Sequence, residues 1–83
     1  MGSQEIMRDF ETWLKETIKK INELDMDDSK KLRLLISLKS LKENKTLHNL
    51  VELMKLLHHY GLHDLCPKSS EIDYWNNQKM LRP

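Results

Sequence analysis

The stretch MKLLHHYGL, residues 54–62, combines a leucine-rich helical pattern with the glycine that ends it. Glycine readily adopts the left-handed backbone conformation that commonly closes helices, and Leu62 can then fold back on the helix in a Schellman-type contact. Upstream, apolar residues recur at helical spacing, and either Asn44 or Thr46 can cap the helix that they form. The sequence therefore predicts a helix over about residues 47–60.

Two more helices precede this one. Residues 4–24 show an amphipathic pattern, with apolar side chains on one side and charged ones on the other. The acidic pair Asp27 and Asp28 interrupts the pattern and offers an N-cap for a second helix that reaches about Lys42. Apolar residues surround most of the axis of the second helix, and the narrow polar strip that they leave consists of Lys30, Arg33, Ser37 and Ser40. We therefore expect the second helix to pack centrally.

A short final helix follows Pro67, which prevents simple continuation of the third helix. Residues 70–73 resemble a capping box in which an aspartate replaces the usual Glu or Gln. The final helix should extend through Trp75 and as far as Leu81. Together these patterns predict an all-α, compact bundle of four or five helices, with up-down-up order for the first three.

Length and composition indicate one small domain. Residues 4–81 form a single helical interaction domain in this interpretation, and residues 1–3 look like an expression scar on a fragment of a larger protein. The 14 basic and 13 acidic side chains leave a formal charge of +1, which supplies no general attraction for nucleic acid or anionic membrane. A single cysteine, Cys66, fits a reducing compartment, and no apolar run approaches the ~20 residues of a membrane span.

Two loops are expected to meet at one end of the bundle. Short connections make neighbouring helices antiparallel, so the first and third helices should end at the same pole. The loops, residues 21–26 and 60–65, place apolar side chains beside polar groups where backbone amides lack helical partners. This composition is typical of a recognition pocket. The alternative is structural: Leu24, Leu62 and Leu65 would merely close the end of the bundle.

These loops resemble those of the integrase-binding domain of lens epithelium-derived growth factor and its hepatoma-derived growth factor relatives, a fold related to the N-terminal domain of transcription elongation factor TFIIS. The resemblance covers about residues 10–65 and is carried by residues 20–26, residues 38–41 before Thr46, and residues 54–62. In that family the two loops receive a phenylalanine-containing motif from a disordered partner. The segment after Pro67 matches the family poorly, so we expect the last helix to differ from the family's or to pack loosely.

The resemblance implies a binding site for such a motif on this chain. Asn22 departs from the family's aspartate, so it can accept a hydrogen bond from the ligand backbone without the strength that a charge adds. His58 and His59 stand where the family has basic residues and form an electrostatic rim with Lys55, so affinity for an acidic ligand should rise as the pH falls through about 6.5. The implied partner-binding residues are Ile21, Asn22, Leu24, Met26, Tyr60 and Leu62.

The resulting prediction is a non-enzymatic protein-protein interaction module of the nucleus. Its partners would be disordered segments of transcription or chromatin proteins with phenylalanine and acidic residues. One alternative is a structural or self-associating helical segment of a larger protein, in which exposed leucines such as Leu56 contact another domain. Another is a nucleic-acid-binding helical domain, favoured by the excess of basic residues over residues 30–45.

Other functions have weaker sequence support. His63 and Cys66 have a spacing that zinc sites use, but His58 and His59 should point apart, so we expect no metal and no other cofactor. Residues 53–57 match the LxxLL docking pattern, yet their leucines are expected in the core. The sequence contains no phosphate-binding glycine loop and no converging serine, histidine and acid, so we expect no catalysis.

Overall fold

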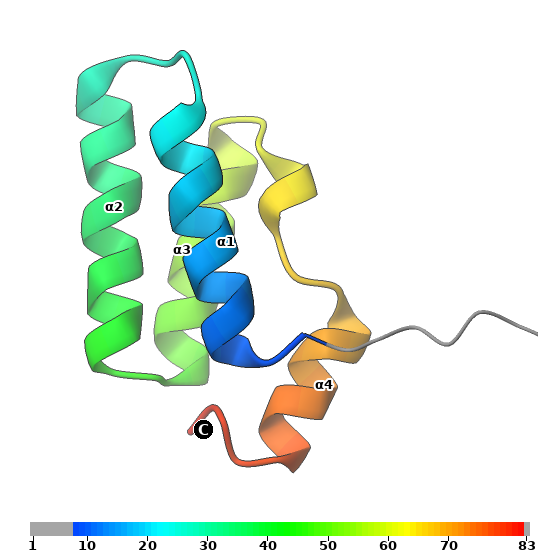
Figure 1. Ribbon diagram of the computed structural model, residues 1–83. Helices are drawn as coiled ribbons and strands as arrows, with labels where there is room; N and C mark the ends of the chain where they lie inside the picture. The colour runs from blue at the N-terminus through cyan, green and yellow to red at the C-terminus, as the bar shows by residue number, and fades with distance from the viewer. Residues whose placement is uncertain (1–7, 83) are drawn as a thin grey trace, which may run out of the picture.

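The computed structural model describes residues 8–82. Over this range the chain forms four α-helices and one short 3-10 helix: α1 (Phe10–Glu23), α2 (Asp28–Glu43), α3 (Leu47–His59), η1 (His63–Leu65) and α4 (Ser69–Asn77). The helices α1 and α3 run in one direction and α2 runs in the other, while α4 lies at the end of the bundle where α1 begins (Figure 1). The all-α bundle and its up-down-up order are confirmed. Among these residues we find no helix with the length and apolar character that a membrane crossing requires.

The first helix begins later than predicted. Arg8 and Asp9 precede α1, and Asp9 has an extended conformation with φ −64° and ψ 160°. Arg8 is held by a long-range contact instead, because its backbone carbonyl accepts a hydrogen bond from Nε1 of Trp75 at 2.8 Å. The expected helical residues 4–7 and the expected scar, residues 1–3, lie outside the described part of the chain.

Local capping signals determine where α2 and α3 begin. The Asp27 carboxylate accepts a hydrogen bond from the backbone N–H of Ser29 at 3.2 Å, as expected for an N-cap. The Thr46 hydroxyl oxygen accepts one from the backbone N–H of Asn49, also at 3.2 Å. Of the two candidate caps for the third helix, Thr46 is therefore the one used.

The core is one cluster in which an aromatic group joins α1 to α4. The rings of Phe10 and Trp75 meet edge to face, with centroids 5.3 Å apart, and Trp13 lies against both rings. Nε1 of Trp13 donates to the carbonyl of Leu65 at 3.1 Å and so attaches η1 to the bundle. Both tryptophans are buried core residues. The cluster consists of Phe10, Trp13, Leu14, Ile21, Leu34, Leu38, Leu41, Leu50, Leu53, Leu57, Trp75 and Leu81.

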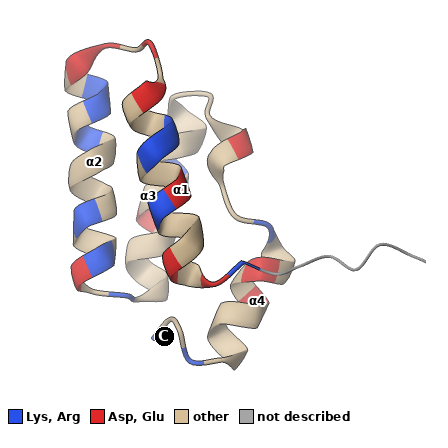
Figure 2. Cartoon of the chain, in the orientation of Figure 1, with Lys and Arg blue, Asp and Glu red and all other residues tan. Residues whose placement is uncertain are grey.

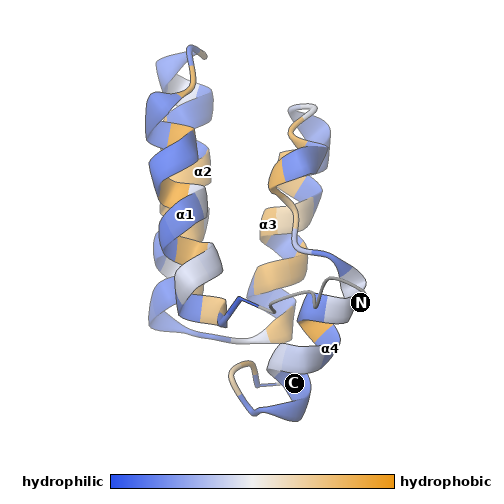
Figure 3. Cartoon of the chain, turned by 45° about the vertical axis from the view of Figure 1, so that its right-hand side comes forward, coloured by the Kyte–Doolittle hydropathy of each residue, from blue (hydrophilic) through white to orange (hydrophobic). Residues whose placement is uncertain are grey.

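The prediction that α2 packs centrally is wrong. Its buried side chains are Leu34, Leu38 and Leu41, whereas Leu32 is 58% exposed and Ile36 is 56% exposed. The helix lies at an edge of the bundle (Figure 1), and apolar bands alternate with hydrophilic ones along its ribbon (Figure 3). α2 contacts both α1 and α3, and the exposure of Leu32 and Ile36 shows that its outer side is left uncovered by the described residues.

The segment after Pro67 packs tightly, so the expected alternative of loose packing is wrong. Trp75 is fully buried and Leu81 is 3% exposed. The N-cap of α4 is Lys68 rather than Ser70, and the N3 carboxylate that accepts the N-cap amide belongs to Glu71, not to Asp73. The helix ends before Leu81.

The tail after α4 then turns back to the connection between α2 and α3. Its turn places Lys79 at a φ of 59°. Arg82 donates its backbone N–H to the carbonyl of Lys45 at 2.8 Å and accepts from the N–H of Leu47 at 2.7 Å. These bonds form an isolated parallel bridge between Thr46 and Arg82. The tail thus closes the end of the bundle opposite the predicted binding loops.

Candidate functional site

The two predicted loops lie at the same end of the bundle (Figure 1). We call this end, made of residues 21–26 and 60–65, the loop pole. Asn22 is exposed, whereas Ile21 is fully buried in the core and does not line the surface. The remaining predicted partner-binding residues are half-buried and pack against the core: Leu24, Met26, Tyr60 and Leu62.

The second loop begins with the turn that the sequence predicted. Gly61 has a φ of 74°, in the left-handed region. Its N–H donates to the carbonyl of His58 at 3.0 Å, and the N–H of Leu62 donates to the carbonyl of Leu57 at 2.8 Å. This pair of bonds defines a Schellman motif. The motif fixes Tyr60 and Leu62 on either side of the glycine, so neither depends on a flexible loop for its position.

Two consecutive lysines in the first turn of α2 reach toward the two loops. Nζ of Lys31 donates to the backbone carbonyl of Asn22 at 3.2 Å, at the end of α1. Nζ of Lys30 lies 5.7 Å from the ring centroid of Tyr60, within the range of a cation-π contact. The start of α2 therefore connects the end of α1 to the end of α3.

The predicted rim contains a histidine pair that the sequence did not reveal. Nδ1 of His58 and Nδ1 of His63 are 2.5 Å apart, and both rings are exposed. A hydrogen bond between them requires one nitrogen to donate and the other to accept. The His59 ring instead lies beside Tyr60 in a tilted arrangement, with centroids 5.3 Å apart and an interplanar angle of 54°, which confirms that His58 and His59 point apart. Lys55 forms an exposed ion pair with Glu52 at 3.3 Å.

Potential metal ligands do not gather in the described residues. Over residues 8–82 there is no group of three or more His, Cys, Asp or Glu side chains that could hold an ion. Cys66 is half-buried, and its Sγ lies 4.0 Å from the carbonyl oxygen of Met54. Burial raises the pKa of the Cys66 thiol, which disfavours the thiolate that metal binding or nucleophilic attack requires.

A charged cluster at the opposite end joins α1 to α4. Arg8 donates from Nε and Nη2 to the two carboxylate oxygens of Glu71, each at 2.9 Å, and from Nη1 to Glu16 at 2.8 Å. Glu71 is 6% exposed, and its pKa is lowered chiefly by the hydrogen bonds from Arg8. The same bonds raise the pKa of Arg8. Each member is paired, so the cluster has the character of a structural clamp rather than a reactive site.

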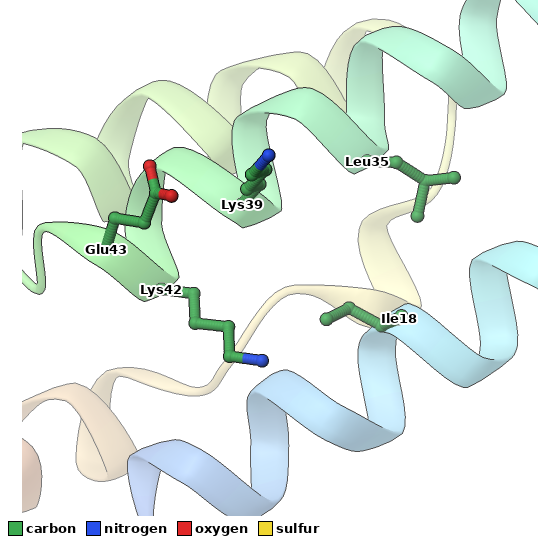
Figure 4. A pocket seen from close by; sticks show the side chains of 5 residues that line it. All are labelled: Ile18, Leu35, Lys39, Lys42 and Glu43. Atoms are coloured by element: carbon green, nitrogen blue, oxygen red, sulfur yellow. The ribbon is translucent and has the colours of Figure 1, made fainter.

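A groove of about 530 Å³ lies between α1 and α2, away from the loop pole. Ile18 of α1 faces Leu35 of α2 across it, and Lys42 projects toward α1 (Figure 4). Lys39 and Glu43 complete its lining. The sequence alone does not reveal this groove, because the groove depends on how the two helices meet.

Comparison with protein-family models, curated proteins and solved structures gives no significant match for this chain.

Proposed function

We propose that this chain is a non-enzymatic interaction module that binds short linear motifs of disordered partner proteins at the loop pole. The observation that carries the proposal is the pair Lys30 and Lys31, which tie the end of α3 and the end of α1 to the same helical turn. Residues from two loops far apart in sequence thereby form one surface. The resemblance of these loops to motif-binding domains of nuclear proteins points to the same function and to partners in transcription or chromatin.

The exposed and the half-buried residues of the loop pole would make different contacts with the partner. An apolar or aromatic side chain of the partner would pack on Leu24, Met26, Tyr60 and Leu62, supported from below by the buried Ile21. The exposed side-chain carbonyl of Asn22 would accept a hydrogen bond from the partner backbone. Acidic residues of the partner would lie near the rim formed by Lys55, His58 and His59.

The loop pole is ordered before a ligand arrives. The Asp27 cap, the bond from Lys31 to Asn22 and the Schellman motif at Gly61 each fix part of the surface. Ordering loops on binding reduces affinity, so a surface held in place retains more of its contact energy. A small domain can in this way bind a short peptide without a deep cavity.

The test is a calorimetric titration with an acidic peptide containing one phenylalanine. Leu62→Asp should abolish binding, because it places a carboxylate against the incoming apolar side chain. Asn22→Asp should tighten binding by about tenfold, since an ionised acceptor makes a stronger hydrogen bond. Asn22 is exposed, so this second change leaves the fold intact.

Circular dichroism of each variant separates binding from folding. A folded Leu62→Asp variant that binds the peptide as the wild type does would exclude the loop pole as the site. Unfolding of that variant, together with an unchanged affinity for Asn22→Asp, would favour the structural alternative, in which the pole only closes the bundle.

A further inference from the structure

The outer side of α2 carries an apolar surface that the other described elements leave uncovered. Leu32 and Ile36 are 58% and 56% exposed, and they lie one helical turn apart. Leu35 is half-buried and lies three residues from Leu32, so the three side chains are neighbours on the helix. We call Leu32, Leu35 and Ile36 the α2 face. Isolated exposed leucines are ordinary, but a continuous set on one helix marks a contact surface.

The α2 face continues into the groove between α1 and α2. Leu35 belongs to both, and Ile18 extends the apolar surface across to α1. Lys39, Lys42 and Glu43 border the groove toward the C-terminal end of α2, so the two cations outnumber the single carboxylate. An apolar strip bordered by cations is complementary to an amphipathic segment whose apolar side is flanked by acids.

The charge of α2 indicates which kind of molecule could bind to the α2 face. The helix has five basic residues against the two acidic residues Asp28 and Glu43, and its basic residues form bands between acidic ends (Figure 2). A second copy of the chain packed through this face would bring two basic helices together, which like charges oppose. Proteins bind single-stranded nucleic acid by stacking its bases on aromatic side chains. The α2 face presents leucine and isoleucine instead, and none of the aromatic residues of the chain is on the α2 face or in the groove lining.

We propose that the α2 face and the adjoining groove dock an amphipathic helix of a partner protein, with leucine-like residues on one side and acidic residues beside them. Its apolar residues cover Leu32, Leu35 and Ile36, and its carboxylates pair with Lys39 and Lys42. This surface shares no residue with the loop pole. The chain would then hold a partner through two separate contacts, which raises overall affinity when both are engaged.

The experiment is a titration of ¹⁵N-labelled protein with a synthetic helical peptide that has leucines at i, i+3, i+4 and i+7 and glutamates elsewhere. Amide shifts should move along α2 and at Ile18 and stay constant at Tyr60 and Leu62. A control peptide with lysines in place of the glutamates should bind far more weakly. Failure of the loop-pole proposal would leave these shifts unaffected, so the two proposals fail independently.

Substitutions of exposed residues provide matched controls. Leu32→Ser and Ile36→Ser should each lower the affinity for the acidic peptide by about fivefold, because slightly more than half of each side chain is exposed in the free protein and would be buried by the peptide. Lys39→Glu and Lys42→Glu should each lower the affinity for this peptide by about threefold, and added salt should make the difference from the wild type smaller. Lys19→Glu, which changes the net charge equally at an exposed position outside the groove, should have the smaller effect.

Three results would overturn the proposal. The first is an unchanged affinity in the Leu32→Ser and Ile36→Ser variants, or peptide shifts confined to the loop pole. The second is self-association of the wild-type chain that Leu32→Ser abolishes, because a second copy would then occupy the face. The third is binding of duplex DNA that Lys39→Glu removes and Leu32→Ser does not, because the surface would then serve nucleic acid.

Discussion

Replacing Glu71 by glutamine should lower the free energy of unfolding by about 2 kcal/mol at neutral pH. The carboxylate is 6% exposed and accepts bonds from Nε and Nη2 of Arg8, both at 2.9 Å, and from the backbone N–H of Lys68 at 3.2 Å. Glutamine keeps one oxygen, which can still accept from Lys68 and cap α4. The charge and the second acceptor are lost, so the bidentate pair with Arg8 cannot form.

The magnitude follows from the kind of bond that is removed. A hydrogen bond to a charged group contributes about 1.5–3 kcal/mol, so the outright loss of one of the two bonds from Arg8 accounts for about 2 kcal/mol. Glu16→Gln is the matched control, because Glu16 binds the same guanidinium at 2.8 Å but its side chain is 46% exposed. An exposed ion pair contributes about 0–1 kcal/mol, so the control should remain close to the wild type.

The two buried tryptophans make fluorescence-detected urea unfolding a suitable assay. A loss of about 2 kcal/mol in a domain of this size also lowers Tm by about 8–16 °C. Because the folded-state pKa of Glu71 is depressed, its stabilisation is present above its unfolded pKa of about 4.3 and is lost as the pH falls through the folded-state pKa. The difference between wild type and Glu71→Gln should therefore be constant from about pH 5 to 7 and shrink below about pH 4. Equal losses for Glu71→Gln and Glu16→Gln, or a difference that persists in acid, would refute the clamp.

Three further predictions concern backbone strain and burial. Gly61→Ala should lower the free energy of unfolding by about 1 kcal/mol in urea titrations, because alanine is strained at a φ of 74° while its Cβ meets nothing within 4 Å. Lys79→Gly should instead stabilise the fold and raise Tm by about 4–8 °C, because Lys79 also lies in the left-handed region, at a φ of 59°. An unchanged Tm would contradict this. Leu38→Asp should abolish the helical circular dichroism signal by burying an unpaired carboxylate, whereas Ile36→Asp, at a 56% exposed position of the same helix, should stay folded.

The local features of the fold could be predicted from sequence because neighbouring residues specify them. Asp27 and Thr46 each satisfy backbone N–H groups within three residues of themselves, and Gly61 closes α3 through bonds to the preceding turn. The loop pole was predictable for a related reason. Short connections leave little choice of helix direction, so the two loops had to share an end.

Most of the errors concern contacts between distant parts of the chain, and the register of the α4 cap is the local exception. Arg8 joins Glu71 across 63 positions, and without that partner it reads as one more helical residue. The apolar residues of α2 show that the helix can be buried on several sides, but they do not show how many sides its neighbours cover. Ile36 therefore has a core-like pattern and an exposed position. Ile21 illustrates the reverse, because a residue expected to contact a ligand is enclosed by the core beneath the loop pole.

The two ends of the bundle are held together differently, and this separates stability from recognition. At one end, Arg8, Glu71 and Trp75 connect segments more than sixty residues apart, and the tail at Arg82 closes the same end. At the loop pole one long-range bond, from Trp13 to the carbonyl of Leu65, is joined by a cap, a glycine turn and two lysine contacts, and the lysine contacts contribute less. Exposed substitutions at the pole should therefore alter a partner's affinity while the fold persists. Changes to the clamp should alter stability and leave the geometry of the pole unchanged.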